Sequence, residues 1–410
     1  MTKPGITLYG TNWCADCKRS KQFFADQRVP YRFVDVDTNA RGLAVVEKAN
    51  GGKSIIPTIR FSDGSFLAEP TNADLAKKLG LVTSAKRSMY DLIVIGSGPA
   101  GLTAALYAAR EGLECLVIER GGIGGQVGIT ERLDNFPGVP GGIAGEEFAD
   151  RLREQAERFG VEILSAQDVT RIEVDDDQRL VHTADGATHR AWAILLAVGS
   201  TYRRLGIDGE DDFIGSGVHY CATCDGPFYR GKDVLVIGGG NSAAEGGLFL
   251  TKFARHVTIV TRGPEFQASK VIIQKIERHP HIDVLHNVEP TAFKGKAHLD
   301  SVVLHDTTSK KERTIKPDGV FVFVGLEPNT GFLKKLVDLD KDGFIVTRSN
   351  LETSVAGIFA AGDCRAGSTA QAASAAGEGA AVALAIRGYI EPLAQGTSVK
   401  ARKPKKRAAS

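Results

Sequence analysis

The sequence predicts an α/β fold in three parts: a small N-terminal unit and two larger units built on parallel strands. Three observations predict it. A Cys-x-x-Cys pair, Cys14 and Cys17, follows the first expected strand, and a strand, a glycine-rich turn and a helix follow one another twice, beginning near residues 90 and 234. Such a turn allows a pyrophosphate to bind at the helix N-terminus. The length of 410 residues suits two or three domains.

The composition is typical of a globular protein, with 42% hydrophobic and 24% charged residues. The net charge is +2, but six cationic residues lie among the last eleven, and without them the charge is −4. We expect residues 396–410 to form a solvated, disordered basic tail, with nucleic-acid or anionic-membrane binding as the alternative. There is no bilayer-spanning apolar run and no room for a signal peptide, and the cysteine pairs do not form a secreted disulfide framework. A cytoplasmic location is therefore expected.

The N-terminal unit is expected to follow the order β-α-β-α-β-β-α. Strands are predicted at 6–9 and 31–36, helices at about 14–27 and 40–50, and a hairpin turns at residues 63–64. At a helix start, unpaired N–H groups and the helix dipole favour a thiolate. Cys14 is therefore the expected nucleophile, and Cys17, one turn later, the resolving thiol.

These residues resemble the glutaredoxin family, and within it mycoredoxin, over about residues 1–82. The motifs that carry the resemblance are Trp13-Cys14-Ala15-Asp16-Cys17, Asn50-Gly51-Gly52, Ile56-Pro57-Thr58 and Phe61-Ser62-Asp63-Gly64-Ser65. The resemblance implies a thioredoxin fold with a cis Pro57 beside the active disulfide, and reduction of protein disulfides or of mixed disulfides with a low-molecular-weight thiol. Asp16 replaces the usual aromatic residue, and we expect its charge to raise the pKa of the neighbouring thiols.

The segment at residues 83–88 is polar and shows no regular spacing of hydrophobic residues, which is typical of a domain linker. Met89 follows it, where a free-standing second protein could begin. The chain is therefore interpreted as a fusion.

The first nucleotide-binding pattern begins with a buried strand at residues 90–95. Gly96, Gly98 and Gly101 permit a tight turn and close approach of the backbone to a pyrophosphate, and a helix follows through Ala109. The next strand, 115–118, ends in Glu119, at the spacing expected of an acid that binds ribose hydroxyls.

The second pattern comprises a strand at 234–237 and the glycine turn that begins at Gly238. Its following strand, 257–260, ends in Thr261-Arg262 and carries no acid. An acid would repel a 2′-phosphate, whereas Arg262 can pair with it, so NADP is expected here rather than FAD or NAD.

Between the two patterns lies a second thiol pair, Cys221 and Cys224, followed by Asp225. Two such cysteines can close a disulfide, and an adjacent acid can supply the proton that reopening requires. Zinc is the alternative, but it needs a second ligand pair, and Cys364 and His256 stand alone. A nicotinamide, a flavin and a disulfide together would form an electron chain.

Residues 89 to about 395 closely resemble low-molecular-weight thioredoxin reductase. The motifs that carry this resemblance are Gly96-Ser97-Gly98-Pro99-Ala100-Gly101, Gly124-Gly125-Gln126, Asn135-Phe136-Pro137-Gly138, Cys221-Ala222-Thr223-Cys224-Asp225-Gly226, the glycine turn from Gly238 to Ala243, and Ala360-Ala361-Gly362-Asp363. The resemblance implies two Rossmann-like domains of the three-layer ββα type: a discontinuous FAD domain (89–204 and 328–395) and an NADPH domain (205–327). It also implies hinges near 203–206 and 325–328 about which the domains rotate.

The resemblance also implies roles for single residues. Cys224 would face the flavin, Cys221 would attack the acceptor disulfide, and Asp225 would be the general acid. The expected FAD-binding residues are Gly96, Gly98, Pro99, Ala100, Gly101, Glu119, Arg120, Gly125, Gln126, Asn135, Gly362, Asp363, Gln371 and Ala372. The expected NADPH-binding residues are Gly238, Gly240, Asn241, Ser242, Ala243 and Arg262.

The sequence departs from this family at several positions. Gly263 and Gln267 stand where basic residues usually contact the 2′-phosphate, so NADH is not excluded as the coenzyme. Ala370 replaces an Arg that many relatives carry. We expect His219 to be a loop residue without a redox role. Cys115 and Cys364 are expected to be inert packing residues.

The sequence thus predicts an FAD-dependent disulfide reductase that passes electrons from NADPH through FAD and Cys221/Cys224 to Cys14/Cys17. The final acceptor is a thioredoxin-like or glutaredoxin-like protein or a low-molecular-weight disulfide. A homodimer is expected, and a linker of six residues leaves open whether the relay runs within one chain or between two. Two alternatives are an electron donor to a peroxidase, resembling the flavoprotein of alkyl hydroperoxide reductase, and a redox-sensing flavoprotein with a basic tail that binds nucleic acid.

Overall fold

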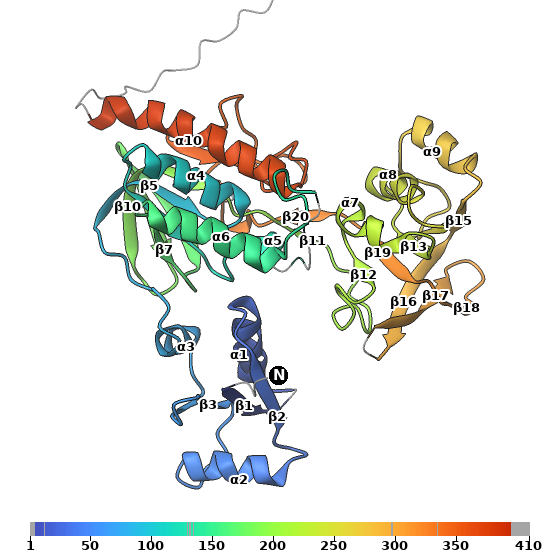
Figure 1. Ribbon diagram of the computed structural model, residues 1–410, viewed down its shortest axis with the longest axis horizontal. Helices are drawn as coiled ribbons and strands as arrows, with labels where there is room; N and C mark the ends of the chain where they lie inside the picture. Colours follow the sequence, from blue (N-terminus) through green and yellow to red (C-terminus); the bar gives the residue numbers. More distant parts are fainter. Residues whose placement is uncertain are drawn as a thin grey trace, which may run out of the picture. The chain divides into compact units, whose positions relative to one another are not determined.

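The structure is a computed structural model of the 410-residue chain. It describes residues 5–11, 13–128, 130, 133, 135–296, 298–333 and 335–394, without the side chains of Asp26, Thr223 and Cys224. The chain divides into two compact units, whose elements are labelled in Figure 1. Unit 1 comprises Met1–Ile129, Glu146–Gly199 and Pro328–Ser410, and unit 2 comprises Thr130–Gly145 and Ser200–Glu327. The chain therefore crosses from unit 1 to unit 2 and back twice.

The N-terminal part of unit 1 is a four-stranded sheet with helices on both faces. Its elements are β1 (Ile6–Gly10), α1 (Ala15–Asp26), β2 (Tyr31–Asp35), α2 (Ala40–Ala49), β3 (Thr58–Arg60), β4 (Phe66–Ala68) and α3 (Asn72–Lys78), which confirms the predicted order. The strands lie in the order β2-β1-β3-β4, with β1 parallel to β2 and antiparallel to β3. Leu8 packs in one cluster with Phe24 of α1 and Leu75 of α3, whereas Tyr9 packs with Val46 of α2. Because neighbouring strand residues face opposite sides, α1 and α3 cover one face and α2 the other.

Polar side chains define where α2 and α3 begin. Asn39 accepts the backbone N–H of Gly42 at 2.8 Å. Thr71 and Asp74 form a capping box, in which each side chain accepts the other residue's backbone N–H. These bonds satisfy donors that the first turn of a helix leaves unpaired, so the helix starts follow from local sequence.

The linker predicted at residues 83–88 contains no helix or strand. The backbone N–H of Lys86 donates to the Glu162 carboxylate at 2.8 Å, and the Arg87 guanidinium lies 2.9 Å from the Glu114 carboxylate. These two contacts therefore hold the C-terminal end of the segment, residues 86–87, against Glu162 and Glu114.

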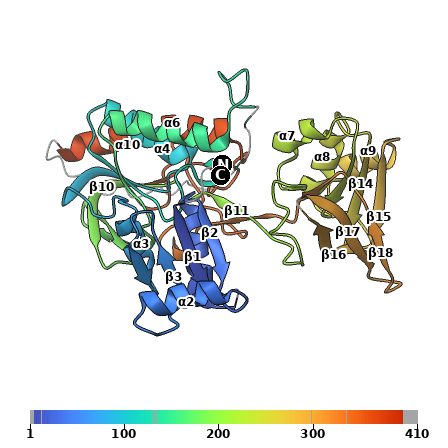
Figure 2. The ribbon, with the colours of Figure 1, turned by 60° about the horizontal axis from the view of Figure 1, so that its bottom comes forward.

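The larger part of unit 1 is a parallel sheet with helices on one face. Its elements are β5 (Met89–Ile95), α4 (Pro99–Arg110), β6 (Cys115–Ile118), α5 (Gly125–Gly128), α6 (Gly145–Arg158), β7 (Glu162–Leu164), β8 (Val169–Asp175), β9 (Gln178–Thr183), β10 (Thr188–Leu196), η2 (Gly331–Leu333), β21 (Ile358–Ala360) and α10 (Ala372–Ala394). Parallel pairings join β7, β6, β5 and β10 in that order, and β21 is also parallel to β10. In both ribbon views α4, α6 and α10 lie on the same side of this sheet (Figures 1 and 2).

Three layers result because alternate residues of β5 face different neighbours. Leu92 and Val94 pack with Leu102 of α4 and Ile386 of α10. Ile93 lies in a second cluster with residues of β8 and β9. Strand β10 belongs to two layers, since its first half pairs antiparallel with β9 and its second half pairs parallel with β21. The predicted three-layer ββα architecture is confirmed.

Unit 2 repeats this plan with a five-stranded parallel sheet and a three-stranded antiparallel meander. Its elements are β11 (Ser200–Tyr202), β12 (Val218–His219), α7 (Ala222–Asp225), η1 (Gly226–Tyr229), β13 (Asp233–Ile237), α8 (Asn241–Leu250), β14 (His256–Thr261), α9 (Lys270–Glu277), β15 (Ile282–His286), β16 (Val288–Gly295), β17 (Leu299–Asp306), β18 (Glu312–Ile315), β19 (Gly319–Val322) and β20 (Leu326–Pro328). The parallel sheet has the order β12-β19-β13-β14-β15, and β11 pairs with β20. Leu235 packs with residues of the meander, whereas Val234 and Val236 pack with residues of α8 and α9.

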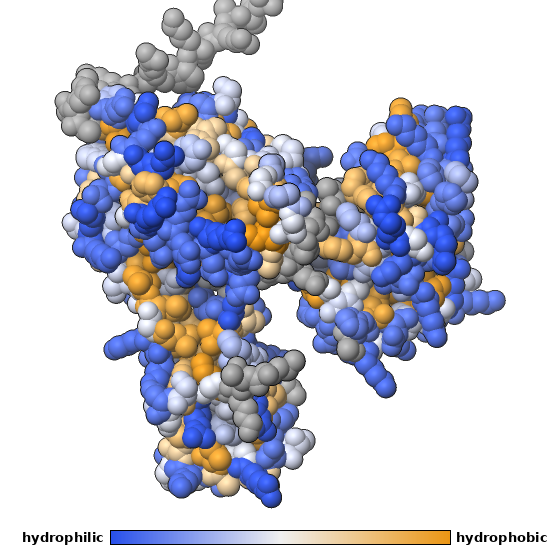
Figure 3. All heavy atoms as spheres, in the orientation of Figure 1, coloured by the Kyte–Doolittle hydropathy of each residue, from blue (hydrophilic) through white to orange (hydrophobic). Residues whose placement is uncertain are grey.

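The outer surface contrasts with these buried clusters. The face of the molecule drawn in Figure 3 is largely hydrophilic. Within the residues that the structure describes, no helix has both the length and the apolar character that crossing a membrane requires.

Candidate functional site

The first thiol pair lies at the start of α1, as predicted. Cys14 is the N-cap residue, and its sulfur accepts the backbone N–H of Cys17 at 3.1 Å. Both cysteines are free thiols. Cys14 is 8% exposed whereas Cys17 is fully buried, so an external disulfide reaches Cys14 first. An N–H group directed at a sulfur stabilises its thiolate, which fits the expected nucleophile.

Cys17 has the properties of a resolving thiol. Burial raises the pKa of the Cys17 thiol to about 12, and its hydrogen bond with Cys14 acts in the same direction. Its sulfur occupies space that only a glycine at residue 10 leaves free, because a methyl group there would lie 2.6 Å from it. Cys17 therefore stays protonated at neutral pH until its partner has reacted.

The expected effect of Asp16 is not found at Cys17. Its exposed carboxylate forms a 2.8 Å ion pair with Arg19. Burial and Cys14, not Asp16, raise the pKa of Cys17. The Ile56–Pro57 peptide bond is cis, as the resemblance implied, and the Cys14 sulfur lies 4.0 Å from the Ile56 carbonyl oxygen. Pro57 thus lies beside the thiol pair.

The first glycine turn connects β5 to α4. Gly96 has φ +103°, and a Cβ there would lie 2.3 Å from the Ala197 carbonyl oxygen. Gly98 is the N-cap residue of α4 and Pro99 follows it. Since neither residue has a side chain that can cap the helix, the first N–H groups of α4 remain available to an anion. This turn fits the pyrophosphate of a dinucleotide.

Two other predicted FAD-binding residues, Glu119 and Gly125, lie beside this turn. The buried Glu119 carboxylate accepts the Ser97 backbone N–H at 2.8 Å and the Ser97 hydroxyl at 2.7 Å. Gly125 begins α5, and a Cβ on it would lie 3.6 Å from the Gly98 Cα. Gln126 and Arg120 are exposed nearby in the chain. Asn135 belongs to unit 2 and is likewise exposed.

The C-terminal glycine segment approaches the same turn. A Cβ on Gly362 would lie 3.0 Å from the Ala100 Cβ, which brings residue 362 against the first turn of α4. Burial raises the pKa of the adjacent Asp363 carboxyl, and its oxygen accepts the Ser368 hydroxyl at 3.2 Å. Gln371 precedes α10, and Ala372 begins it. Gly362 and the glycine turn thus belong to one region of unit 1, where the sequence predicts the FAD site.

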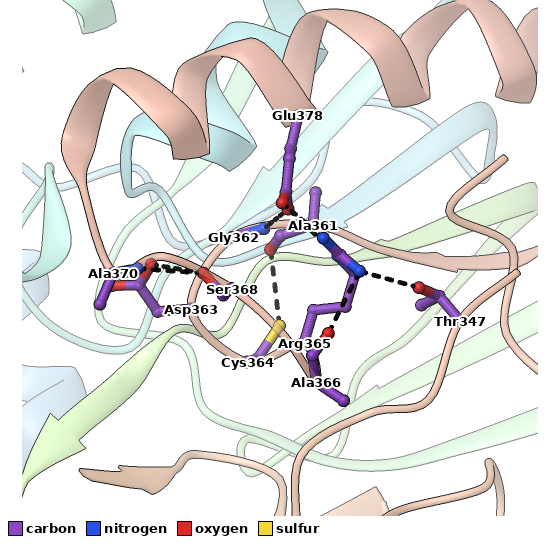
Figure 4. Close-up of polar contacts among 10 residues, drawn as sticks. All are labelled: Thr347, Ala361, Gly362, Asp363, Cys364, Arg365, Ala366, Ser368, Ala370 and Glu378. Carbon is purple, nitrogen blue, oxygen red and sulfur yellow. Dashed lines mark hydrogen bonds and ion pairs between the residues drawn. The ribbon is translucent and has the colours of Figure 1, made fainter. Parts of the chain in front are cut away.

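Sequence reasoning missed the pair that holds this segment (Figure 4). The Glu378 carboxylate of α10 accepts the Gly362 backbone N–H at 2.8 Å and pairs with the Arg365 guanidinium at 2.6 Å. Both side chains are mostly buried. Nothing in the local sequence connects residue 378 to residue 362.

The second glycine turn connects β13 to α8 in unit 2. Gly238 has φ +147°, and a Cβ there would lie 2.4 Å from the Phe323 carbonyl oxygen. Gly240 is the N-cap residue of α8 and offers no capping side chain. Asn241 and Ser242 are exposed in the first turn, whereas Ala243 is fully buried beneath Gly238. This turn also fits a dinucleotide phosphate.

Arg262 lies at the carboxyl end of β14, on the exposed side of the turn. Gln267, which replaces a family Arg, donates its backbone N–H to the Gly239 carbonyl oxygen at 2.7 Å. Residue 267 is therefore anchored directly against the glycine turn. A longer cationic side chain at residue 267 would therefore extend from beside the turn at which the sequence predicts NADPH binding.

The second thiol pair lies between β12 and η1. Cys221 takes part in a disulfide bond. The Cys224 side chain, to which the sequence assigned the flavin-facing role, lies outside the described part of the structure. Asp225 ends the short helix α7, and its backbone N–H donates to the Cys221 carbonyl oxygen at 3.1 Å.

His219 was expected to be a loop residue, and this expectation is wrong. It lies on β12 and is only 9% exposed. Its Nε2 atom lies 2.6 Å from the Tyr229 hydroxyl, and its Nδ1 atom lies 3.5 Å from the Asp225 carboxylate. The residue that the sequence dismissed therefore contacts the predicted general acid.

The remaining cysteines are buried. Cys115 and Cys364 are both free thiols, and burial raises the pKa of Cys364 to about 12 and that of Cys115 further still. Neither is poised to act as a thiolate at neutral pH. Across the described residues, no group of three or more His, Cys, Asp or Glu side chains is arranged to hold a metal ion.

Two family models match the chain in separate regions. The model described as pyridine nucleotide-disulphide oxidoreductase matches residues 90–379, and the glutaredoxin model matches residues 6–67. Each match corresponds to one side of the 83–88 segment.

Individual proteins show the same relationship. A bifunctional thioredoxin reductase/thioredoxin of Mycobacterium leprae is 44% identical over 302 residues, which are 73% of this chain and 66% of that protein. A thioredoxin reductase of Treponema pallidum is 42% identical over 304 residues, covering 74% of this chain and 98% of that protein. The crystal structure of thioredoxin reductase from Streptococcus pyogenes superposes with a TM-score of 0.70 at 38% identity, covering 74% of this chain and 99% of that one.

Proposed function

Because the chain belongs to the thioredoxin reductases within the pyridine nucleotide-disulphide oxidoreductase family, we propose that its two thiol pairs act in series. The protein is a flavoprotein disulfide reductase that carries a glutaredoxin domain at its N-terminus. In the proposed relay, electrons pass from NADPH through FAD to Cys221/Cys224, then to Cys14/Cys17, and finally to an external disulfide.

The glycine turn of unit 1 would hold the FAD pyrophosphate, with Glu119 at its ribose and the Gly362-Asp363 segment against the first turn of α4. The turn of unit 2 would hold NADPH, with Arg262 as the cation for the 2′-phosphate. When bound, the two cofactors supply a hydride and pass two electrons to a disulfide. The residues of the chain bind the phosphates, orient the ribose and supply protons.

At the second pair, the disulfide takes up two electrons and two protons and becomes two thiols. We assign Asp225 as the donor of one of these protons, since it is next to Cys224 in the chain and its backbone is bonded to Cys221. A proton delivered to the departing sulfur makes it a neutral thiol and drives the bond to open.

The transfer to the first pair is a thiol–disulfide exchange. The Cys221 thiolate attacks the oxidised Cys14–Cys17 pair, forms a mixed disulfide and releases the other sulfur, which takes up a proton. Cys224 then attacks the Cys221 sulfur of the mixed disulfide, which re-forms the Cys221–Cys224 bond and releases the redoxin sulfur, so that Cys14/Cys17 is left reduced. Cys14, which is more accessible than Cys17 and is stabilised by the Cys17 N–H, next attacks the external disulfide, and Cys17 resolves the product.

The relay presumes the domain division expected from the sequence: 1–82, a linker at 83–88, the FAD domain at 89–204 and 328–395, and the NADPH domain at 205–327. A short tether presents the first pair to the second at an effective concentration of order mM when it can span the gap. The homodimer, the cytoplasmic location, the choice of NADPH over NADH and the identity of the final acceptor stay predictions. The comparisons favour a disulfide reductase over a donor to a peroxidase.

One observation carries the proposal: a thiol pair with nucleophile geometry at the start of α1 is fused to a complete flavoprotein disulfide reductase. The test is Cys14→Ser in the full-length, FAD-loaded protein, with turnover of an external disulfide followed by NADPH absorbance. We expect loss of turnover while NADPH still bleaches the flavin. Turnover equal to that of the unmodified protein would contradict the relay.

A further inference from the structure

We propose that His219 is a positioning residue for the Asp225 carboxyl group, and that Tyr229 holds His219 in place. The three side chains form a series, with a hydrogen bond between Tyr229 and His219 and a 3.5 Å approach of His219 to Asp225. This inference rests on the proposed role of Asp225 as proton donor. It adds a residue that the sequence had dismissed.

The contacts fix the His219 ring from two sides. Nε2 lies 2.6 Å from the Tyr229 hydroxyl, a short hydrogen bond, and Nδ1 lies 3.5 Å from the Asp225 carboxylate. The Asp225 side chain is 22% exposed and that of His219 only 9%. Because the ring is shielded from water, an attraction between His219 and Asp225 is screened less than on the surface.

Aromatic packing restricts the ring further. The Tyr229 ring stands edge-on to it, with centroids 5.3 Å apart and an interplanar angle of 71°. The Phe321 ring lies on another side at 5.3 Å. Phe321 is also the register partner of His219 in the β12–β19 pairing, so the sheet itself sets their distance. The imidazole therefore has little freedom to rotate away from Asp225.

Tyr229 reaches His219 only because residue 319 is a glycine. A Cβ on Gly319 would lie 2.2 Å from the Tyr229 Cε1 atom and 2.6 Å from its hydroxyl oxygen. Any side chain at this position would displace the tyrosine ring. The site of Gly319 on β19 and the site of His219 on β12 are neighbours in one sheet, and together they leave a space that the Tyr229 ring fills.

The chemistry assigns a direction to the series. The carboxylate that Asp225 becomes on giving up its proton only accepts hydrogen bonds, so Nδ1 carries a proton toward it, and Nε2 accepts from the Tyr229 O–H. When Asp225 gives its proton to the departing sulfur, a carboxylate remains. The Nδ1–H group stabilises that anion, and His219 neither gains nor loses a proton in the step.

The experiment uses the full-length, FAD-loaded protein, with NADPH oxidation driven by hydroxyethyl disulfide. His219→Phe keeps a planar aromatic ring, although a larger one, but removes both nitrogens. His219→Asn keeps an N–H donor near the Nδ1 position. We expect His219→Phe to lower kcat by roughly tenfold without changing the KM for NADPH, and His219→Asn to recover most of the rate. Tyr229→Phe should lower kcat by a smaller factor, because it removes the hydrogen bond to Nε2 but leaves the Nδ1 atom beside Asp225.

Asp225→Asn separates this inference from the function on which it depends. With Asp225 replaced, His219 has no acid to position, so adding His219→Phe should cause no further loss. Multiplicative losses in the double variant would overturn the inference, as would a His219→Phe enzyme with the kcat of the unmodified protein. Full activity of Asp225→Asn would instead overturn the assignment of Asp225 itself. Because Asn can replace His219 without removing the donor, its failure to recover the rate in a folded protein would also count against the proposal.

Discussion

The Glu378 carboxylate accepts the backbone N–H of Gly362 at 2.8 Å and therefore joins α10 to the glycine segment that follows β21. The same carboxylate holds the Arg365 guanidinium through both oxygens, at 2.6 and 3.2 Å (Figure 4). A single side chain thus fixes the segment that carries Asp363, which we assign to FAD.

Glu378→Ala is expected to loosen this segment. It leaves the Gly362 N–H and the mostly buried Arg365 charge without their acceptor, at a cost of about 1–3 kcal/mol in unfolding free energy, and it should weaken retention of FAD. Glu378→Gln should cost less, because its amide oxygen still accepts from Gly362. Thermal unfolding and fluorescence of released flavin measure both effects.

The matched control is Glu391→Gln, which removes an exposed partner of Arg387 on the same helix. Exposed pairs contribute at most about 1 kcal/mol, so its unfolding temperature should change little. Equal behaviour of the Glu378→Ala and Glu391→Gln proteins would contradict the proposed role of Glu378.

Gly10→Ala is expected to destabilise the N-terminal sheet. The new methyl group would lie 2.6 Å from the Cys17 sulfur and 3.3 Å from a Leu8 methyl group, both fully buried. Overpacking of this kind costs about 1–3 kcal/mol, and displacement of Cys17 should also slow the exchange with external disulfides. Gly388→Ala is the control, because its methyl group meets open space within α10. It should be neutral or slightly stabilising in the same denaturant titration.

Alkylation by iodoacetamide should separate the two N-terminal thiols. Burial raises the pKa of Cys17 to about 12, so a rise in pH from 7 to 9 leaves this thiol protonated and its reaction slow. Cys14 is the more accessible sulfur and should be modified first. Peptide mapping of the reduced native protein by mass spectrometry gives both rates, with buried Cys364 as an internal reference. If iodoacetamide modified Cys17 as fast as Cys14 at pH 8, the folded protein would not keep the Cys17 thiol protonated, and the prediction would be contradicted.

Gln267→Arg should sharpen the preference for NADPH. Residue 267 is bonded through its backbone to Gly239, so a guanidinium there can reach the 2′-phosphate together with Arg262. One charge-assisted hydrogen bond contributes about 1.5 kcal/mol, which corresponds to a roughly tenfold rise in the ratio of kcat/KM for NADPH to that for NADH. Gln274→Arg places the same charge on the exposed surface of α9 as a control. An equal change in both variants would mean that overall charge, not contact, sets the preference.

Much of the fold followed from local sequence. The N-terminal order of strands and helices was predicted correctly because turn residues, helix starts and hydrophobic periods act over a few residues. The two glycine turns were also predicted from the sequence. Gly96 and Gly238 adopt positive φ values and lie so close to backbone oxygens that no side chain would fit.

Contacts between distant segments were decided only by the tertiary structure. The sequence around Glu378 does not predict its contact with Gly362. The sequence around His219 does not predict its contacts with Asp225 and Tyr229, which follow the thiol pair in the chain. The effect of Asp16 on Cys17 was predicted wrongly because the pKa of Cys17 is set mainly by its burial, which sequence spacing does not give. The sequence determined which chemical groups the protein carries and which turns its backbone makes. The tertiary packing determined which of those groups come into contact. A buried contact depends on residues that are far apart in the sequence, and local sequence does not show which of them become neighbours.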